Sequence, residues 1–413
     1  MKAPLQKVLL ALSAIGIVTA GAAIAQFAPP GGGRPGGPPA PGPATTPIAN
    51  FGGPLIGLNA QQRAAFEEGA VEFRTQDTPE TGLGPIFNGR SCAECHSGPA
   101  LGGGSNVTVT RFGRVNESGQ FDPLLALGGS LLQRFAINNL ALERVPAEAN
   151  VIAQRKTTPL FGAGLIEAIP DQAILAAAAR PQADGISGRA ALITDPASGQ
   201  MRVGRFGWKA QHASLLSFSA DAYLNEMGIT NRFFPTENAP NGNQAVLARF
   251  DRVPGIEDAV DPETGRSDID AFTDFMRFLA APPRLVMSAS ARAGESVFAT
   301  TGCGGCHTPS LATGNHPVPA LSNQVVNLYS DLLLHDMGSL GDGIVQGPAA
   351  AREMRTAPLW GVRARAPYLH DGRAPTLDAA IRAHDGEAVI VRNRYLGLTP
   401  AARQQLLDFL GTL

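Results

Sequence analysis

All four cysteines of this 413-residue chain stand in two copies of one motif, and this motif constrains the fold more than any other feature. The copies are Cys92-Ala-Glu-Cys95-His96 and Cys303-Gly-Gly-Cys306-His307. C-x-x-C-H is the attachment motif of c-type haem, in which the two thiols bind the porphyrin and the histidine binds the iron. We therefore predict two covalently bound haem c groups, with His96 and His307 as proximal iron ligands.

Other uses of paired cysteines explain less of the motif. A zinc site would account for the C-x-x-C pairs, but not for a histidine directly after both of them. A thioredoxin-like redox pair needs a βαβ context, which is absent around both copies. A disulfide within each pair is possible outside the cytoplasm, but it too leaves the histidines unexplained.

The composition fits a chain that is organised by cofactors as well as by regular secondary structure. Its 48 glycines and 33 prolines are too many for a helical bundle or a long regular sheet. We predict a loop-rich, mostly α fold with minor β structure, in which residues 105–114 form the clearest strand. The 33 basic and 35 acidic residues leave no basic excess for binding nucleic acid. No internal apolar run reaches the length of roughly 18 residues that a membrane span needs.

The N-terminus has the pattern of an export signal. Lys2 and Lys7 precede an apolar run over residues 8–18, and Ala23-Ile24-Ala25 supplies a small-x-small cleavage site. Because the run is short, a cleaved signal peptide over residues 1–25 is favoured over an uncleaved membrane anchor. We predict a periplasmic protein that keeps no membrane span after cleavage. Residues 26–49 are rich in proline, glycine and alanine and are predicted to be a linker.

The remainder of the chain contains a weak internal duplication. In each half a Gly-x-x-x-Phe pattern precedes the C-x-x-C-H motif, and a helix with an N-terminal capping signal closes the half. The matching segments are Gly69 to Phe73 and Gly294 to Phe298, residues 158–162 and 357–361, and helices that begin after Ser267 and Thr399. Pro282-Pro283 separates the halves. We predict two haem domains, residues 50–284 and 285–413.

The second axial ligand of each iron decides what such a protein does. His384 is the best candidate from the pattern, because Leu377, Ile381 and His384 fall on one face of a short predicted helix. A core histidine that is hydrogen-bonded to backbone explains the same pattern. The other histidines outside the motifs are His212, His316, His335 and His370.

Several stretches resemble the bacterial di-haem oxidoreductases, a family of peroxidases and thiol oxidoreductases related to the di-haem cytochrome c peroxidases and MauG-type enzymes. The resemblance covers about residues 60–413 and implies two cytochrome c-like domains. The segments that carry it are GLGPIFNGRSCAECHSGPALGG (82–103), TTPLFGAGLIEAIP (157–170), RFGWKAQHASL (205–215), NEMGITN (225–231), LLLHDMG (332–338) and RTAPLWGVRARAPYLHDGRAPTLDAAIRAHDGEA (355–388).

The resemblance assigns roles to particular residues. In the family the distal ligand of the C-terminal haem follows the histidine of a PYLHDG-like segment by fourteen positions, which leads from His370 to His384. The peroxidases have Met there and MauG-type enzymes have Tyr, so a histidine implies a lower potential than Met ligation. The resemblance also places Trp208 between the haems and Glu226 in the distal pocket of the N-terminal haem. Their structural alternatives are an interface aromatic and a helix-surface glutamate.

One departure from the family suggests that the N-terminal iron is open. Bis-His peroxidases carry a distal histidine sixteen residues after the first motif, a position that is Phe112 here. Met227 and His212 remain alternative ligands. Relatives also hold calcium between their domains, and the acidic residues 257–270 are a candidate calcium site or an ordinary solvated loop.

These residues together imply a peroxidase. Hydrogen peroxide would be reduced at the N-terminal haem with Glu226 as general acid–base. Electrons would come from a small donor protein, such as a cytochrome or a cupredoxin, through the C-terminal haem and Trp208. The alternatives are a non-catalytic electron-transfer cytochrome, and oxidation of a larger substrate as in MauG-type enzymes or the related rubber oxygenases.

Overall fold

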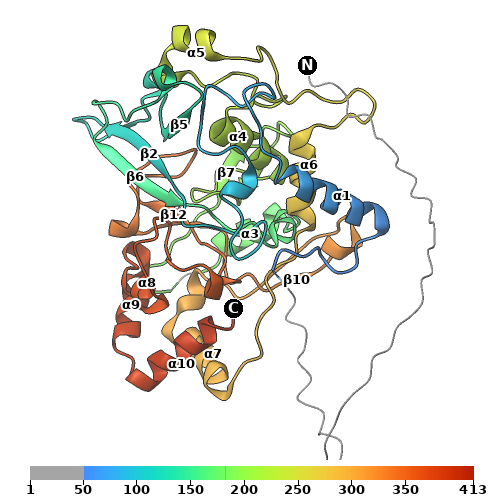
Figure 1. The fold of residues 1–413 in the computed structure, drawn as a ribbon. Helices are drawn as coiled ribbons and strands as arrows, with labels where there is room; N and C mark the ends of the chain where they lie inside the picture. Colours follow the sequence, from blue (N-terminus) through green and yellow to red (C-terminus); the bar gives the residue numbers. More distant parts are fainter. Residues whose placement is uncertain (1–50, 182) are drawn as a thin grey trace, which may run out of the picture. The chain divides into compact units, whose positions relative to one another are not determined.

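The structure is a computed structural model that describes residues 51–413 apart from residue 182 (Figure 1). The predicted signal peptide and linker, residues 1–49, lie outside the described residues. Helices account for 34% of the structure and strands for 15%, so the predicted excess of helix over strand is confirmed. In the part of the chain that is described, no helix is both long and apolar enough to cross a bilayer.

Each half of the chain begins and ends with a helix, and the two helices of each half pack together. Helix α1 (Ala60–Glu72) leads to the first motif and packs on α6 (Asp268–Phe278), while α7 (Ala289–Thr301) leads to the second motif and packs on α10 (Pro400–Leu410). Both pairs are visible in Figure 1. The predicted caps are confirmed, since Ser267 forms a capping box and the Thr399 side chain accepts from Ala402 N.

A glycine lies at each of these helix crossings. A Cβ atom at Gly69 would clash with the backbone oxygen of Ala271 in α6, and one at Gly294 would clash with that of Gln405 in α10. The duplicated glycines of the sequence therefore allow the close approach of two helix backbones.

Replacing Gly294 with alanine is expected to destabilise the protein by about 1–3 kcal/mol, because the added methyl group forces α7 and α10 apart. Gly397→Ala is the matched control, since its Cβ would lie no closer than 3.5 Å to the nearest atom. Thermal unfolding of both variants measures the difference. Equal melting temperatures would show that the crossing tolerates a side chain.

Both motifs have the same local geometry. A single 3-10 turn covers Cys92–Glu94 in the first motif and Cys303–Gly305 in the second. The amides of His96 and His307 each bond the carbonyl oxygen four residues earlier, at 3.0 Å. The two histidines are thus held in equivalent positions relative to their cysteines.

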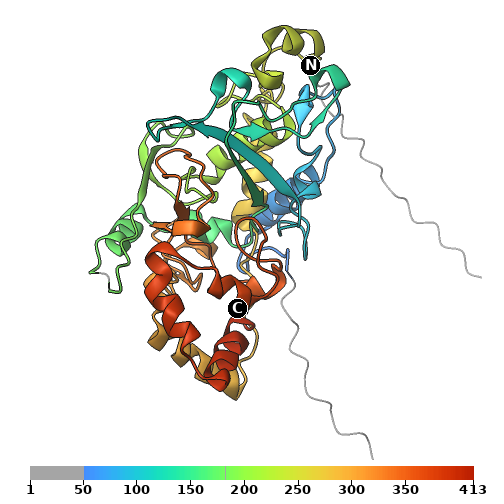
Figure 2. The ribbon, with the colours of Figure 1, turned by 90° about the vertical axis from the view of Figure 1, so that its left-hand side faces the viewer.

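The β structure is short and antiparallel, with one longer pair. Strand β2 (Thr108–Val115) pairs with β6 (Val151–Lys156) from Thr108 opposite Lys156 to Gly113 opposite Val151. The strand predicted over residues 105–114 is therefore confirmed, with its start three residues later. Figure 2 shows this teal pair, and the orange and red C-terminal helices gathered together.

The remaining helices and strands lie between α1 and α10 in the sequence. The other helices are α2 (Ala163–Glu167), α3 (Asp171–Ala178), α4 (Leu215–Met227), α5 (Gln244–Phe250), α8 (Leu377–Arg382) and α9 (Val389–Leu396). The other strands are β1 (Ile86–Phe87), β3 (Phe121–Asp122), β4 (Leu131–Leu132), β5 (Phe135–Ala136), β7 (Ala191–Thr194), β8 (Met201–Gly204), β9 (Leu311–Ala312), β10 (Val325–Val326), β11 (Leu334–Asp336) and β12 (Glu353–Arg355).

The chain has two main hydrophobic clusters of different size. The larger one surrounds α1, α4 and α6 and also includes Leu311, Leu328 and Leu333 of the second half, and the smaller one lies around α7 and α10. The predicted boundary near residue 284 falls between α6 and α7. Residues Ala49–Leu413 nevertheless form one compact unit, and the division into two domains stays a prediction.

Candidate haem sites

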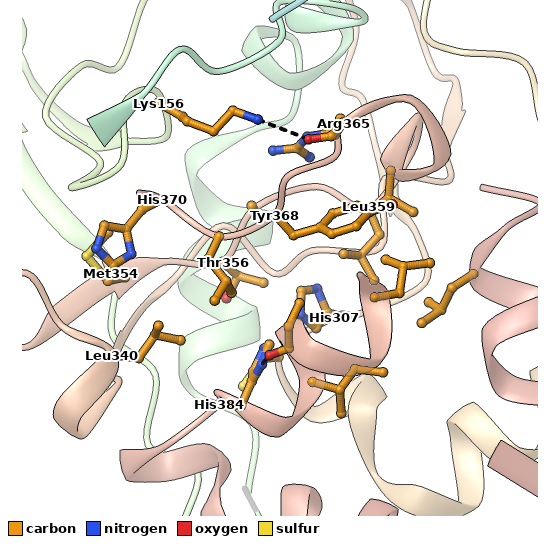
Figure 3. A pocket seen from close by; sticks show the side chains of 18 of the residues that line it. Lys156, His307, Leu340, Met354, Thr356, Leu359, Arg365, Tyr368, His370 and His384 are labelled. Carbon is orange, nitrogen blue, oxygen red and sulfur yellow. Dashed lines mark hydrogen bonds between the residues drawn. The ribbon is translucent and has the colours of Figure 1, made fainter. Parts of the chain in front are cut away.

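The second motif lies in the wall of a cavity of about 470 Å³. Cys303, Cys306 and His307 line it, as do Phe298 of α7 and Leu410 of α10. Figure 3 shows the cavity from close by. Its volume is in the range of cofactor-binding sites, and its lining is mostly apolar.

Two histidine rings face each other inside this cavity. The ring centres of His307 and His384 are 6.4 Å apart. His307 Nδ1 lies 3.0 Å from the carbonyl oxygen of Tyr329, and His384 Nδ1 lies 2.8 Å from that of Ala380. Because each Nδ1–H donates to a carbonyl, each Nε2 keeps a free lone pair, which is how metal-binding histidines are usually oriented.

The electrostatics and the spacing of the pair also suit a metal ion. Burial lowers the pKa of His307 to about 4 and also lowers the pKa of His384, so both rings are neutral at physiological pH. A histidine nitrogen lies about 2.0–2.1 Å from a first-row metal ion. With the ring radii added, two such ligands on opposite sides of one ion have centres roughly 6 Å apart. The observed separation is close to this value.

The cavity is also electropositive. Lys156, Arg355, Arg365 and Arg392 line it, and the described lining residues include no aspartate or glutamate. Burial lowers the pKa of Arg355 and of Arg365 to about 10. Figure 3 shows Lys156, whose Nζ donates to the carbonyl oxygen of Arg365 at 3.1 Å. Arg392 is paired with Asp385 at 3.2 Å, whereas Arg355 and Arg365 donate to carbonyl oxygens. Buried cations are usually paired with anions, so this lining fits a flat apolar group with carboxylate substituents, as haem has.

His384 reaches the cavity from just beyond a helix. Thr376 caps α8, and the helix ends at Arg382, so His384 follows the helix instead of lying on it as predicted. Leu377, Ile381 and His384 still line the same cavity. The pattern therefore predicted the correct direction of the side chain, and the role of His384 as an iron ligand stays a prediction.

Replacing His384 with alanine is expected to convert one low-spin ferric haem to high spin and to leave the other spectrum unchanged. His384→Met should instead raise the potential of that haem, since thioether ligation favours the reduced iron. His370→Ala is the control, because His370 lines the same cavity but is paired with the Trp208 ring at 6.2 Å. A low-spin signal that survives in His384→Ala and is lost in His370→Ala would assign the ligand to His370.

The first motif presents its histidine in the same way. His96 Nδ1 lies 3.0 Å from the carbonyl oxygen of Gly103, and burial lowers the pKa of the ring to about 4. The edge of Phe73 packs against it, with ring centres 6.1 Å apart. His96 is therefore also a neutral imidazole that a backbone carbonyl holds at Nδ1, and the backbone of Thr158 is a second hydrogen-bond neighbour of the ring.

The cysteines are not arranged for thiolate chemistry. All four lie within the described residues, and none forms a disulfide. Burial raises the pKa of Cys95 to about 11 and that of Cys303 to about 12. Reactive and zinc-binding cysteines have lowered pKa values. The raised pKa values of Cys95 and Cys303 therefore do not favour a redox pair or a zinc site.

Glu226 lies beside the first motif. It is half-buried near the end of α4, and its Oε2 accepts from Asn88 Nδ2 at 2.9 Å. Burial raises the pKa of Glu226, an effect that Arg111 and Asn88 partly offset. The carboxylate also helps to raise the pKa of the Cys95 thiol. The structure thus brings Glu226 to the first motif, as predicted, and its catalytic role stays a prediction.

Trp208 lies between the segments that follow the two motifs. It lines the large cavity together with Gly104 and Asn106, which come shortly after His96. Its Nε1–H donates to the carbonyl oxygen of Lys156 at 2.8 Å. The indole is therefore fixed in the wall that the first motif's loop shares with the second motif's cavity.

The alternative ligands are placed less favourably. Met227 is buried in the large core, and Phe112 is 1% exposed. His212 Nε2 lies 3.2 Å from Asp221 Oδ2. His335 is buried between Asp331 at 3.0 Å and Glu387 at 2.8 Å. His335 thus already has two carboxylate partners, whereas His212 lies near one carboxylate but makes no hydrogen bond to the described residues through either ring nitrogen.

The acidic stretch considered for calcium makes hydrogen bonds to its own neighbourhood. Glu257 accepts from the Thr230 amide at 2.6 Å, and Asp258 accepts from Ser267 Oγ at 2.9 Å. Within residues 51–413, apart from 182, no group of three or more His, Cys, Asp or Glu side chains is arranged to hold a metal ion. Calcium binding stays a prediction.

Each half thus places one neutral histidine, held by a carbonyl oxygen, directly after its cysteine pair. Residues 139–413 match the family described as "di-haem oxidoreductase, putative peroxidase", and the chain belongs to this family. The family implies haem cofactors and an oxidoreductase function. No curated protein sequence matches the chain.

Solved structures with similar chains come from several redox proteins. Hydrazine synthase of Kuenenia stuttgartiensis is 15% identical, with a TM-score of 0.42 over 93% of this chain and 100% of that chain. A MauG-like protein associated with microbial copper homeostasis is 16% identical, with a TM-score of 0.40 over 91% and 95%. The dihaem peroxidase BthA of Burkholderia thailandensis is 14% identical, with a TM-score of 0.39 over 85% and 86%.

Proposed function

We propose that this protein is a periplasmic peroxidase with two covalent haem c groups, which reduces hydrogen peroxide beside the first motif. The observation that carries the proposal is the difference between the two motifs. His307 faces a second imidazole, His384, whereas the first motif has the carboxylic acid Glu226 close to Cys95. One site is thus suited to electron transfer and the other to acid–base chemistry.

The haem groups, when bound, supply iron that exchanges electrons with peroxide and with a donor. Hydrogen peroxide takes two electrons and two protons, its O–O bond breaks, and two water molecules leave. Glu226 moves a proton between the two oxygens at its carboxylate. Its raised pKa suits this task, because a group that gains and loses protons readily near working pH is the better acid–base catalyst.

The electrons enter from a small periplasmic donor protein, a cytochrome or a cupredoxin, at the His307 and His384 site. Trp208 lies on the electron-transfer path between the two haem sites, since its indole is fixed by a hydrogen bond and lines the cavity of the second motif. Lys156, Arg355 and Arg365 line that cavity and would hold the haem carboxylates by charge-assisted hydrogen bonds.

Ligand binding by the reduced protein tests this proposal. One haem of two should bind carbon monoxide, and peroxide turnover with a reduced donor should be measurable. Trp208→Phe should slow electron transfer between the haems more than it slows peroxide binding. If both haems are low spin, neither binds carbon monoxide and no turnover occurs, the protein is an electron carrier. If larger substrates are oxidised but a reduced donor is not, the MauG-like alternative holds.

A further inference from the structure

One buried cation near Glu226 has no part in the reaction described above. Arg111 lies on β2, and its Nε is buried without a hydrogen-bond partner. Buried polar groups in proteins are nearly always paired, and an unpaired donor costs about 1–3 kcal/mol. An unpaired guanidinium nitrogen therefore points to a partner that the chain does not itself supply.

The neighbouring arginine on the same face of the strand pair differs in this respect. Val109 pairs with Arg155 and Arg111 pairs with Ala153, so both arginines project from one face of β2 and β6. Arg155 Nε lies 2.7 Å from Asp342 Oδ2, which makes a buried ion pair. Arg155 Nη2 is unpartnered as well, so the contrast is confined to Nε: the Nε of Arg155 meets a carboxylate of the described chain, and the Nε of Arg111 does not.

The sheet register and the charges around Arg111 place it near the end of α4. Arg111 pairs with Leu131 of β4, and Gln133, two residues further on, donates from Nε2 to the carbonyl oxygen of Asn225 at 3.0 Å. Glu226, Asp221 and Asp342 partly offset the lowering of its pKa, which burial and the like charge of Arg155 cause. Asp221 is already paired with His212 and Asn225. Glu226 in turn acts on the Cys95 thiol. Arg111, Glu226 and Cys95 therefore share one neighbourhood.

Arg111 also stands directly before Phe112, the position where bis-His relatives carry a distal histidine. Successive side chains of a strand point to opposite faces, so the guanidinium and the Phe112 ring occupy different sides of the sheet. Phe112 is fully buried on its side. The position of the relatives' distal histidine is thus filled by an apolar ring, and Arg111 is the cationic side chain of the opposite face.

We propose that Arg111 is a substrate-contacting residue, whose guanidinium donates a hydrogen bond to peroxide, or to a small anion, held beside Glu226 at the first haem. The proposal rests on the proposed function, since it requires that the first haem has an open site. A guanidinium donates charge-assisted hydrogen bonds, which are shorter and stronger than neutral ones. It would stabilise the negative charge that develops on a peroxide oxygen as the O–O bond lengthens.

Binding of fluoride and of imidazole to the ferric holoprotein tests the proposal. Fluoride is a small anion that needs a hydrogen-bond donor, whereas imidazole binds iron as a neutral ligand. Arg111→Leu should weaken fluoride binding by about tenfold or more, and leave imidazole binding within about twofold. Arg114→Leu is the matched control, because Arg114 lies on the same strand and is exposed. Arg111→Lys, which keeps a cation, should lose less fluoride affinity than Arg111→Leu. It provides the test if the leucine variant does not fold.

Each other outcome overturns the inference. Unchanged fluoride affinity in both Arg111 variants would overturn it and leave the proposed function intact. Equal loss of fluoride and imidazole affinity would show that Arg111 acts on the haem itself, through a haem carboxylate or its placement. If the wild-type protein binds neither ligand, the open site is absent, and the proposed function fails together with the inference.

Discussion

Replacing Glu226 with glutamine is expected to lower peroxide turnover by about 10²–10⁴-fold, while both haems stay attached. Glutamine keeps the size of the side chain and its hydrogen bond with Asn88, but it cannot carry a proton between two oxygens. Steady-state turnover with a reduced donor measures the loss. The haem content and the spectra of the variant should equal those of the wild-type protein.

The pH dependence gives a second readout of the same group. Burial raises the pKa of Glu226 above its ordinary value. If peroxide deprotonation requires the carboxylate, activity should fall as the pH drops through this raised pKa. The acidic limb of the pH–activity profile should therefore lie at higher pH than it would for an exposed glutamate. Glu226→Gln should remove that limb. Glu68→Gln, at an exposed position of α1, is the control and should change neither the rate nor the profile.

Wild-type turnover in the Glu226→Gln variant would show that Glu226 is not the acid–base group. Turnover that is lost together with the haem at His96 would indicate a structural role instead. The two cases are separated by the haem content of the purified variant.

The parts of the fold that depend on neighbours in sequence could be predicted. Ser267 and Thr399 cap their helices because a cap needs only the first turn of the helix. The motif histidines are fixed by a single 3-10 turn, so their equivalence was readable from the C-x-x-C-H spacing. His384 was found because a helical period links it to Leu377 and Ile381, although the helix ends before it.

The parts of the fold and of the candidate site that depend on pairing between distant segments could not be predicted from the sequence. Arg355 and Arg365 line the cavity from a segment that reads as an ordinary apolar loop with basic residues, and their burial appears only once the chain has closed around the cavity. The neighbourhood of Arg111 and Glu226 joins a strand to a helix more than a hundred residues away. Strands of two or three residues, such as β11 and β12, carry too little alternation to be predicted.

Replacing Cys303 and Cys306 with alanine is expected to halve the covalent haem content, and to cost more stability than the same change at Cys92 and Cys95. The hydrophobic cluster around α7 and α10, beside the second motif, has only eight buried residues. Four of them, Phe298, Val362, Leu406 and Leu410, line the cavity around the second motif. Without a covalent haem these side chains face a cavity of about 470 Å³, and an apolar cavity that cannot collapse is strongly destabilising.

The first half is expected to tolerate the loss of its haem better, because its helices pack around a core that is much larger. The pyridine haemochrome yield measures the haem per chain, and thermal unfolding of the two double variants measures the asymmetry. Each variant controls for the other, since both remove two thiols and one haem. Extraction of all haem from the wild-type protein by acid acetone would show that the attachment is not covalent. Equal melting temperatures would show that the haem is not part of the second core, and that the small cluster around α7 and α10 is stable by itself.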